Sequence, residues 1–144
     1  MIFAIQKQPS NFKDVYLSIS KEQGENLKQL IKQKNIKNIV EFGTSFGIST
    51  LFLAQGALAT QGKIVTTELI ESKALQAIRN FKKAGVNDLI EVRIGDAVKT
   101  LKNYTDSIDL LLLDGWKTLY LPVFEMLESN FHKSLHLQKD HLSQ

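Results

Sequence analysis

The chain has 144 residues and a mass of 16.3 kDa, which is the ordinary size of one globular domain. Hydrophobic residues make up 43% of it and charged residues 23%, a balance that excludes a disordered chain, a collagen and a coiled-coil rod. It contains no cysteine, so disulfides, thiolate metal sites and a cysteine nucleophile are excluded, and we expect a cytoplasmic protein. Only two prolines and no internal repeat interrupt the chain, which predicts a single domain over residues 1–144.

The charge distribution and the short apolar stretches restrict the partners. The formal net charge is +3 and the isoelectric point about 9.1, but lysine and arginine alternate with acidic residues along the whole chain, so we expect no nucleic-acid partner. The longest apolar stretches are far below the roughly 18 residues that a membrane span needs. No basic segment precedes an apolar run at the start, which argues against a signal peptide. We therefore expect no membrane partner.

The sequence predicts helices and strands that alternate along the chain. Ser20 and Gln23 have the spacing of a capping box, which predicts a helix from Lys21 to about Gln33. Gly85 is expected to end a later helix, and Pro122 to open the last one. Hydrophobic spacing predicts the other elements, namely strands within 36–42, 64–68, 90–94 and 108–114 and helices within 48–58, 74–81 and 98–101.

Four strands that alternate with helices predict an α/β fold, a Rossmann-like doubly wound parallel sheet in three layers. Such sheets bind ligands at the carboxyl ends of their strands. The candidate site residues are therefore those that follow the four predicted strands, namely Glu41 to Gly47, then Glu68, then Gly95 and Asp96, then Asp114 to Lys117.

The segment from Glu41 to Gly47 is a glycine turn between a strand and a helix. A residue without Cβ lets a ligand approach the backbone, and the helix N-terminus offers free N–H groups. Glu68 stands at the end of the next predicted strand, where a carboxylate can accept both hydroxyls of a ribose. This combination predicts a nucleoside-containing cofactor.

The charges near the turn favour one cofactor over another. A dinucleotide fingerprint would require glycine at positions 45 and 48, where this chain has Ser45 and Ile48. Glu41 and Asp114 would repel phosphates but attract a cation, and S-adenosylmethionine carries an ammonium and a sulfonium. The residues therefore favour S-adenosylmethionine, with an NAD-binding Rossmann domain as the alternative.

From about Ser20 to Leu127 the sequence resembles the class I S-adenosylmethionine-dependent O-methyltransferases, and among them the catechol O-methyltransferase-like group. Residues 40–49, Val-Glu-Phe-Gly-Thr-Ser-Phe-Gly-Ile-Ser, are similar to the motif that wraps the methionine end of the donor. The resemblance implies donor contacts from Glu41, Gly43, Ser45, Gly47 and Ser49. It also implies a ribose contact from Glu68 and an adenine-side loop at Gly95-Asp96-Ala97.

Residues 113–120, Leu-Asp-Gly-Trp-Lys-Thr-Leu-Tyr, carry the most specific similarity. The resemblance implies that Asp114 binds a divalent metal and also contacts the donor, that Trp116 lines the donor pocket and that Lys117 is the catalytic base. It implies methyl transfer to a small-molecule hydroxyl, such as a phenol or catechol, with Mg²⁺ as a second cofactor. Gly115 departs from the larger residue that can occur there.

Family members usually continue with a fifth strand that ends in Asp-Asn and with two further strands. Residues 131–144 contain neither an apolar run nor an Asp-Asn pair, so the chain resembles a methyltransferase truncated after its fourth strand. Asp114 would then lack partner ligands and bind a metal weakly. We therefore expect weak or absent methyl transfer, and a donor-binding remnant without turnover is a second alternative.

Without those strands, the strand at 108–114 is expected to be an exposed apolar edge. A stripe of Phe124, Leu127, Phe131 and Leu135 on the last helix could cover this edge or pair with a second copy, which predicts a homodimer. The opposite stripe, formed by Glu128, His132, His136 and Asp140, has a spacing that can ligate zinc. A solvated helix face is the stronger interpretation of that stripe.

Overall fold

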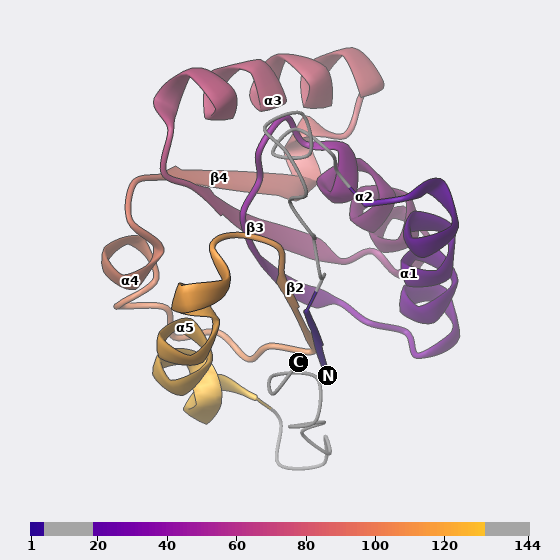
Figure 1. The fold of residues 1–144 in the computed structure, drawn as a ribbon. Coiled ribbons are helices and arrows are strands. Elements are labelled where there is room, and N and C mark those ends of the chain that lie inside the picture. Colours follow the sequence, from indigo (N-terminus) through magenta and orange to yellow (C-terminus); the bar gives the residue numbers. More distant parts are fainter. Residues whose placement is uncertain (5–18, 132–144) are drawn as a thin grey trace.

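The computed structural model describes residues 1–4 and 19–131, and its centre is a parallel sheet of five strands (Figure 1). The order across the sheet is β1-β5-β2-β3-β4, and every neighbouring pair is parallel. The strands are β1 (Ile2–Ala4), β2 (Asn38–Phe42), β3 (Lys63–Glu68), β4 (Ile90–Ile94) and β5 (Leu110–Leu113).

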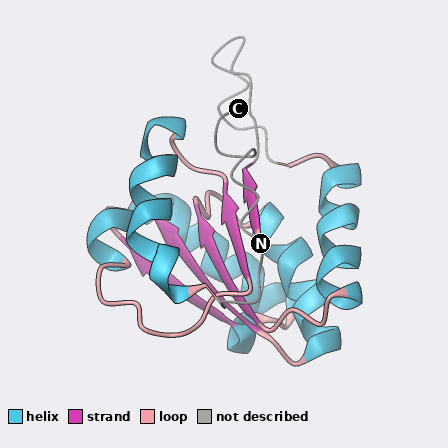
Figure 2. Cartoon of the chain, turned by 90° about the horizontal axis from the view of Figure 1, so that it is seen from below, coloured by secondary structure: helices cyan, strands magenta, loops and turns pink. Residues whose placement is uncertain are grey.

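Helices cover both faces of this sheet (Figure 2). Apolar residues of α1 (Lys21–Gln33), α2 (Ile48–Thr60) and α3 (Glu71–Ala84) pack on one face. Those of α4 (Ala97–Thr100) and α5 (Tyr120–Leu127) pack on the other, which we call the α4/α5 face. The predicted three-layer, doubly wound fold is confirmed. None of the helices in the described ranges is long and apolar enough to cross a membrane.

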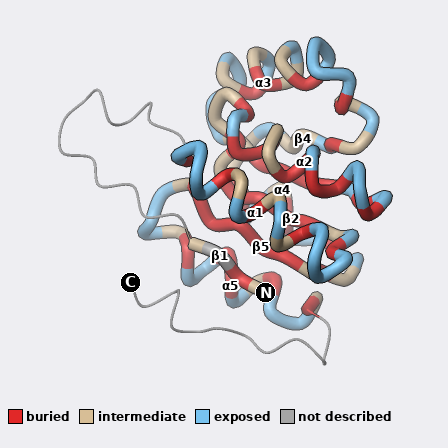
Figure 3. Tube along the Cα trace, turned by 90° about the vertical axis from the view of Figure 1, so that its right-hand side faces the viewer, coloured by how far each residue is buried: buried red, intermediate tan, exposed pale blue. Residues whose placement is uncertain are grey.

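The central strands are apolar on both sides because both faces are covered. All four residues of β5 are completely buried, and their side chains alternate between the two faces: Leu110 and Leu112 lie with α1–α3, Leu111 and Leu113 with α4 and α5. Figure 3 shows β5 and β2 as buried segments between more exposed helices. The uninterrupted leucine run is therefore the sequence of an interior strand.

The helix ends follow the predicted signals, with one difference. Ser20 and Gln23 form the expected capping box, and Gly85 ends α3 with a positive φ of 74°. The last helix begins at Tyr120 rather than at Pro122, so its predicted start was wrong by two residues. A proline is tolerated there because the N–H groups of the first helical turn have no partner within the helix.

The expectation that the strand at 108–114 is an open edge was wrong. β1, which the sequence did not predict, pairs with β5 in parallel, and the Leu111 N–H donates to the Met1 carbonyl at 2.8 Å. Ile2 is completely buried with the apolar residues of the α4/α5 face. Pairing satisfies the backbone groups of β5 and buries apolar area at the same time.

The apolar stripe of the last helix also lies inside the chain. Phe124, Leu127 and Phe131 pack on the α4/α5 face of the sheet, while Leu135 lies outside the described residues. The same holds for His132, His136 and Asp140 of the opposite stripe. The homodimer stays a prediction, but the open edge and the described part of the stripe no longer support it.

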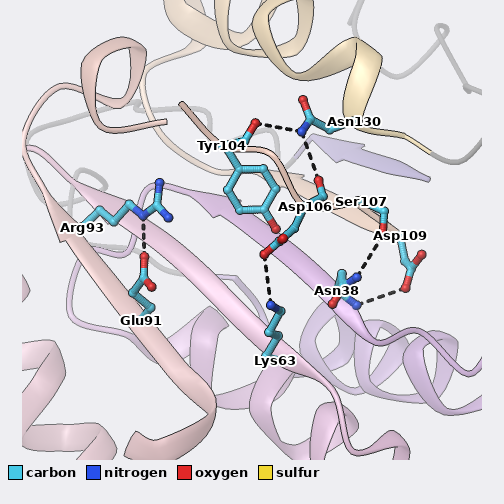
Figure 4. A network of polar contacts seen from close by, with 9 residues as sticks. All are labelled: Asn38, Lys63, Glu91, Arg93, Tyr104, Asp106, Ser107, Asp109 and Asn130. Atoms are coloured by element: carbon cyan, nitrogen blue, oxygen red, sulfur yellow. Dashed lines mark hydrogen bonds and ion pairs between the residues drawn. The ribbon is translucent and has the colours of Figure 1, made fainter. Parts of the chain in front are cut away.

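A polar network holds the amino-terminal ends of the strands together (Figure 4). An oxygen of Asp109 accepts the N–H groups of Lys37 and Asn38, each at 3.0 Å. Lys63 pairs with Asp106 at 3.1 Å, and the Asn130 side chain donates to the Asp106 carbonyl at 3.0 Å. These bonds join the starts of β2 and β3 to the segment before β5, at the end of the strands opposite the candidate site.

Candidate functional site

The sheet has a topological switch point between β2 and β5. The chain passes from β2 to β3 and β4 in one direction and then returns to β5 on the other side of β2. The connections therefore diverge at this point, and sheets of this kind bind ligands beyond the carboxyl ends of the two strands, a region that we call the crevice. The glycine turn follows β2 and Asp114 follows β5, and the Asp114 N–H donates to the Phe42 carbonyl at 2.8 Å. The fold thus brings two of the predicted segments together.

The glycine turn lies directly against the segment after β5. Gly43 has a φ of 102°, and a Cβ built on it would lie 2.7 Å from the Asp114 carbonyl carbon and from the Gly115 nitrogen. The N–H groups of Gly43 and Thr44 both donate to the Thr67 carbonyl at the end of β3. A side chain at position 43 would therefore separate the two segments that form the crevice.

Glu68 has two backbone partners and holds the glycine turn. One carboxylate oxygen accepts the Ser45 N–H at 2.7 Å, and the other accepts the Ile70 N–H at 3.0 Å. Ser45 itself has a φ of 51°, which is uncommon for a residue other than glycine. Each carboxylate oxygen keeps a further lone-pair position, so Glu68 can still accept the hydroxyls of a ribose.

Glu41 is a buried carboxylate with three hydroxyl donors. Ser49 donates to one oxygen at 2.6 Å, while Thr66 at 2.7 Å and Thr50 donate to the other. Glu41 has no exposed surface, and this burial raises its pKa to about 7, against the opposing effect of the three hydroxyls. The charge of Asp114 raises this pKa further.

Ser49 connects the two carboxylates of the site. Its hydroxyl lies 2.6 Å from an oxygen of Glu41 and 3.5 Å from an oxygen of Asp114. Asp114 is 7% exposed, so both negative groups are shielded from water beside the crevice. Two shielded carboxylates attract a cationic ligand more strongly than exposed ones would.

The segment after Asp114 begins in the partly buried part of the site and continues onto the surface. Gly115 lies on the Phe42 ring, whose carbons are 2.7 Å from the position that a Cβ would take. This contact explains why the larger residue of the family pattern is absent here. Trp116 is 65% exposed and Lys117 is exposed, so both lie at the surface of the loop that Asp114 begins.

Tyr120 lies beneath this loop and was not among the predicted site residues. Its ring contacts Phe42 edge to face, with 6.2 Å between the ring centroids. Burial, and secondarily the charge of Asp114, raises the pKa of the Tyr120 hydroxyl. Tyr120 is the last residue of the segment 113–120, but only the fold shows that its ring packs against Phe42.

The predicted adenine-side residues lie beside Glu68. The Gly95 N–H donates to the Glu68 carbonyl at 2.8 Å. The Asp96 side chain caps α4 by accepting the Val98 N–H at 3.0 Å, and Ala97 is buried on the α4/α5 face. The structure thus gives Asp96 and Ala97 local structural contacts, and it places them next to the end of β3.

Sequence reasoning missed two threonines around Glu41, Thr50 and Thr66, and it included Thr44 only as part of the glycine turn. Thr44 follows Gly43, Thr50 lies in the first turn of α2, and Thr66 is paired in register with Glu41 on the neighbouring strand. All three are buried. Hydroxyl residues in an otherwise apolar strand and helix were the available signal, because buried polar groups need partners.

A separate hollow of about 540 Å³ lies at the opposite edge of the sheet. It is lined by residues 104–107, before β5, and 129–131, after α5. No predicted site residue is among them. The hollow is therefore separate from the candidate site at the carboxyl ends of the strands.

The chain is similar to several known O-methyltransferases. The family model of the O-methyltransferases matches residues 4–135. A catechol O-methyltransferase of Niastella koreensis is 31% identical over 113 residues, which are 76% of this chain and 51% of that protein. Caffeoyl-CoA O-methyltransferase 1 of Eucalyptus globulus is 32% identical over 124 residues, 83% of this chain and 47% of that protein.

A solved structure gives the same result. The O-methyltransferase from Bacillus cereus in complex with SAH (S-adenosylhomocysteine) superposes with a TM-score of 0.74 at 33% identity, over 80% of this chain and 54% of that one. This chain spans about half the length of the curated relatives it matches. The resemblance drawn from the motifs is confirmed: the chain belongs to the O-methyltransferase family.

Proposed function

We propose that the chain binds S-adenosylmethionine at the carboxyl ends of β2 to β5 and transfers its methyl group to a small-molecule hydroxyl, such as that of a phenol or catechol. The observation that carries the proposal is the pair of buried carboxylates, Glu41 and Asp114, with Ser49 between them next to the glycine turn. The similar structure with SAH bound supports the choice of donor. The NAD alternative loses support, because the family match is to O-methyltransferases.

The chemistry of the residues fits this donor. Glu41 and Asp114 are placed to neutralise an ammonium and a sulfonium, and Glu68 to accept ribose hydroxyls. When bound, S-adenosylmethionine supplies a methyl group made electrophilic by its positive sulfur. Lys117 Nζ, on the exposed loop after Asp114, is the group that we assign to accept the proton of the acceptor hydroxyl.

Magnesium does not fit the described part of the chain. Within residues 1–4 and 19–131, no group of three or more histidine, cysteine, aspartate or glutamate side chains comes together that could hold a metal ion. Asp114 alone would bind a divalent cation weakly. A metal therefore has no role in the proposed reaction, and we propose slow methyl transfer because the acceptor hydroxyl keeps its high pKa.

Titration calorimetry with S-adenosylhomocysteine and with NAD tests donor binding. We expect the chain to bind the first and not the second. Glu68→Gln should weaken binding by about 1.5–3 kcal/mol, because a hydrogen-bond acceptor of the ribose loses its charge. Glu71→Gln makes the same change at an exposed position in the first turn of α3 and should leave affinity unchanged. Binding of NAD instead would refute the proposal, and equal affinities of the two variants would remove Glu68 from the site.

A single-turnover assay with labelled S-adenosylmethionine and a panel of catechols and other phenols tests methyl transfer. We expect slow transfer that Lys117→Ala lowers by on the order of 100-fold or more, the usual contribution of a general base. Lys83→Ala, at an exposed lysine of α3, is the control. Unchanged transfer in Lys117→Ala would exclude Lys117 as the base. Fast, magnesium-dependent turnover would show that the site is complete and contradict the expected slow rate.

A further inference from the structure

A chain of buried hydroxyls connects the glycine turn to Glu41. The Thr44 and Thr66 hydroxyl oxygens are 2.6 Å apart, and Thr66 donates to Glu41 at 2.7 Å. Thr44 and Thr66 are 1% and 0% exposed, so water does not compete for these bonds. The three residues come from the turn, β3 and β2, and the bonds join these segments just below the crevice.

The hydroxyl protons of Thr44 and Thr66 can be assigned in one consistent way. A threonine hydroxyl has a single proton, and the proton of Thr66 is directed to Glu41. The hydrogen bond between the two threonines therefore takes its proton from Thr44. The direction runs from Thr44 to Thr66 to Glu41. Removal of the Thr66 hydroxyl would leave the Thr44 hydroxyl without this acceptor and would take from Glu41 one of its three hydroxyl donors.

The same bonds determine how the Glu41 carboxylate is oriented. Thr66 and Thr50 both donate to one oxygen, which leaves the other oxygen directed to Ser49 and, beyond it, to Asp114. Rotation of the carboxylate would break the bonds from both threonines. The oxygen that Ser49 contacts is thus held on the side of the crevice.

We propose that Thr66, supported by Thr44, is a positioning residue that orients Glu41 for the cationic end of the methyl donor. The inference rests on the proposed function, because it concerns the same donor site. It adds that donor affinity depends on a hydroxyl that lies inside the sheet and that acts through Glu41.

The test compares Thr66→Val, Thr66→Ser and Thr60→Val, and it measures S-adenosylhomocysteine affinity by calorimetry and stability by urea unfolding. Valine keeps the shape of threonine without its hydroxyl, and serine keeps the hydroxyl. Thr60 is the matched control, because it is also buried in the chain and its hydroxyl donates at 2.6 Å to the Ile36 carbonyl, at a distance from the crevice. Both valine variants lose a buried hydrogen bond, so both should lose stability.

Only Thr66→Val should lose affinity, by about tenfold or more, as expected for a disturbed hydrogen bond to a charged group. Thr66→Ser should bind with the affinity of the original chain, since it restores the donor. If Thr66→Val does not fold, Thr44→Val replaces it and should weaken binding by about threefold, because its bond to Glu41 is indirect.

The outcomes separate the two proposals. Failure of the original chain to bind S-adenosylhomocysteine would overturn the proposed function. Normal binding by the original chain and equal binding by Thr66→Val, or by Thr44→Val in its place, would overturn the positioning role alone. Loss of affinity in Thr60→Val to the same extent would show that lost stability, rather than the orientation of Glu41, weakens binding.

Discussion

Gly43→Ala is expected to destabilise the fold by about 3 kcal/mol or more and to abolish donor binding. Two costs add at this position. The backbone has a φ of 102°, which side chains other than glycine rarely adopt, and the new Cβ would lie 2.7 Å from backbone atoms of Asp114 and Gly115. The backbone atoms of Asp114 and Gly115 cannot rotate away as the end of a flexible side chain would. The new Cβ would therefore push the glycine turn away from the segment after β5.

Gly85→Ala is the matched control for this change. Gly85 also has a positive φ, 74°, but no atom lies within 4 Å of the position of its Cβ. Gly85→Ala should lower the free energy of unfolding by only about 1 kcal/mol and leave donor affinity unchanged. Urea unfolding and calorimetry with S-adenosylhomocysteine measure both effects. Equal losses of stability in the two variants would mean that the contact between Gly43 and Asp114 does not restrict the turn.

The second large effect is a pH dependence that comes from Glu41. Burial raises the pKa of this carboxyl from 4.5 to about 7, so between these values the folded chain holds a proton that the unfolded chain has released. Folding stability from this group is therefore present below about pH 4.5 and is lost as the pH rises towards about 7. The loss is on the order of 3 kcal/mol.

Glu41→Gln removes this titration while keeping the hydrogen bonds of a protonated carboxyl. One side-chain oxygen remains to accept from Thr50 and Thr66, and the new NH₂ can donate to Ser49. Urea unfolding at several pH values from 5 to 8 should show that the stability of Glu41→Gln relative to the original chain increases as the pH rises. The difference between the two cancels the titration of all other groups, so a difference that stays constant would contradict the raised pKa.

The affinity for the donor should also depend on the ionisation of Glu41, but it should rise with pH where the folding stability falls. The ammonium of S-adenosylhomocysteine favours the ionised form of Glu41, so affinity should rise with pH through about 7 in the original chain. Glu41→Gln should bind more weakly and without this rise. An identical pH profile in the two proteins would place Glu41 outside the cationic part of the site.

The local pattern of the sequence was sufficient to predict the fold class and to indicate which residues lie at the ends of the strands. Alternation of apolar strands with amphipathic helices specifies a parallel sheet, because both faces must be covered. Gly43 and Asp114 follow directly after strands and Glu68 is the last residue of one, and the carboxyl ends of parallel strands meet at one edge. Site residues of this kind are predictable because their position depends on the strand that precedes them.

Only the tertiary structure decided which distant residues meet. The pairing of β1 with β5 joins segments more than a hundred residues apart, and a strand of three residues has too little hydrophobic pattern to predict. The contact of Gly115 with Phe42 and the bonds of Thr44, Thr50 and Thr66 around Glu41 depend on the register of neighbouring strands and on the placement of α2. Register and packing are set by the burial of the whole sheet, so a short stretch of sequence determines which face a residue occupies but not which partner it finds there.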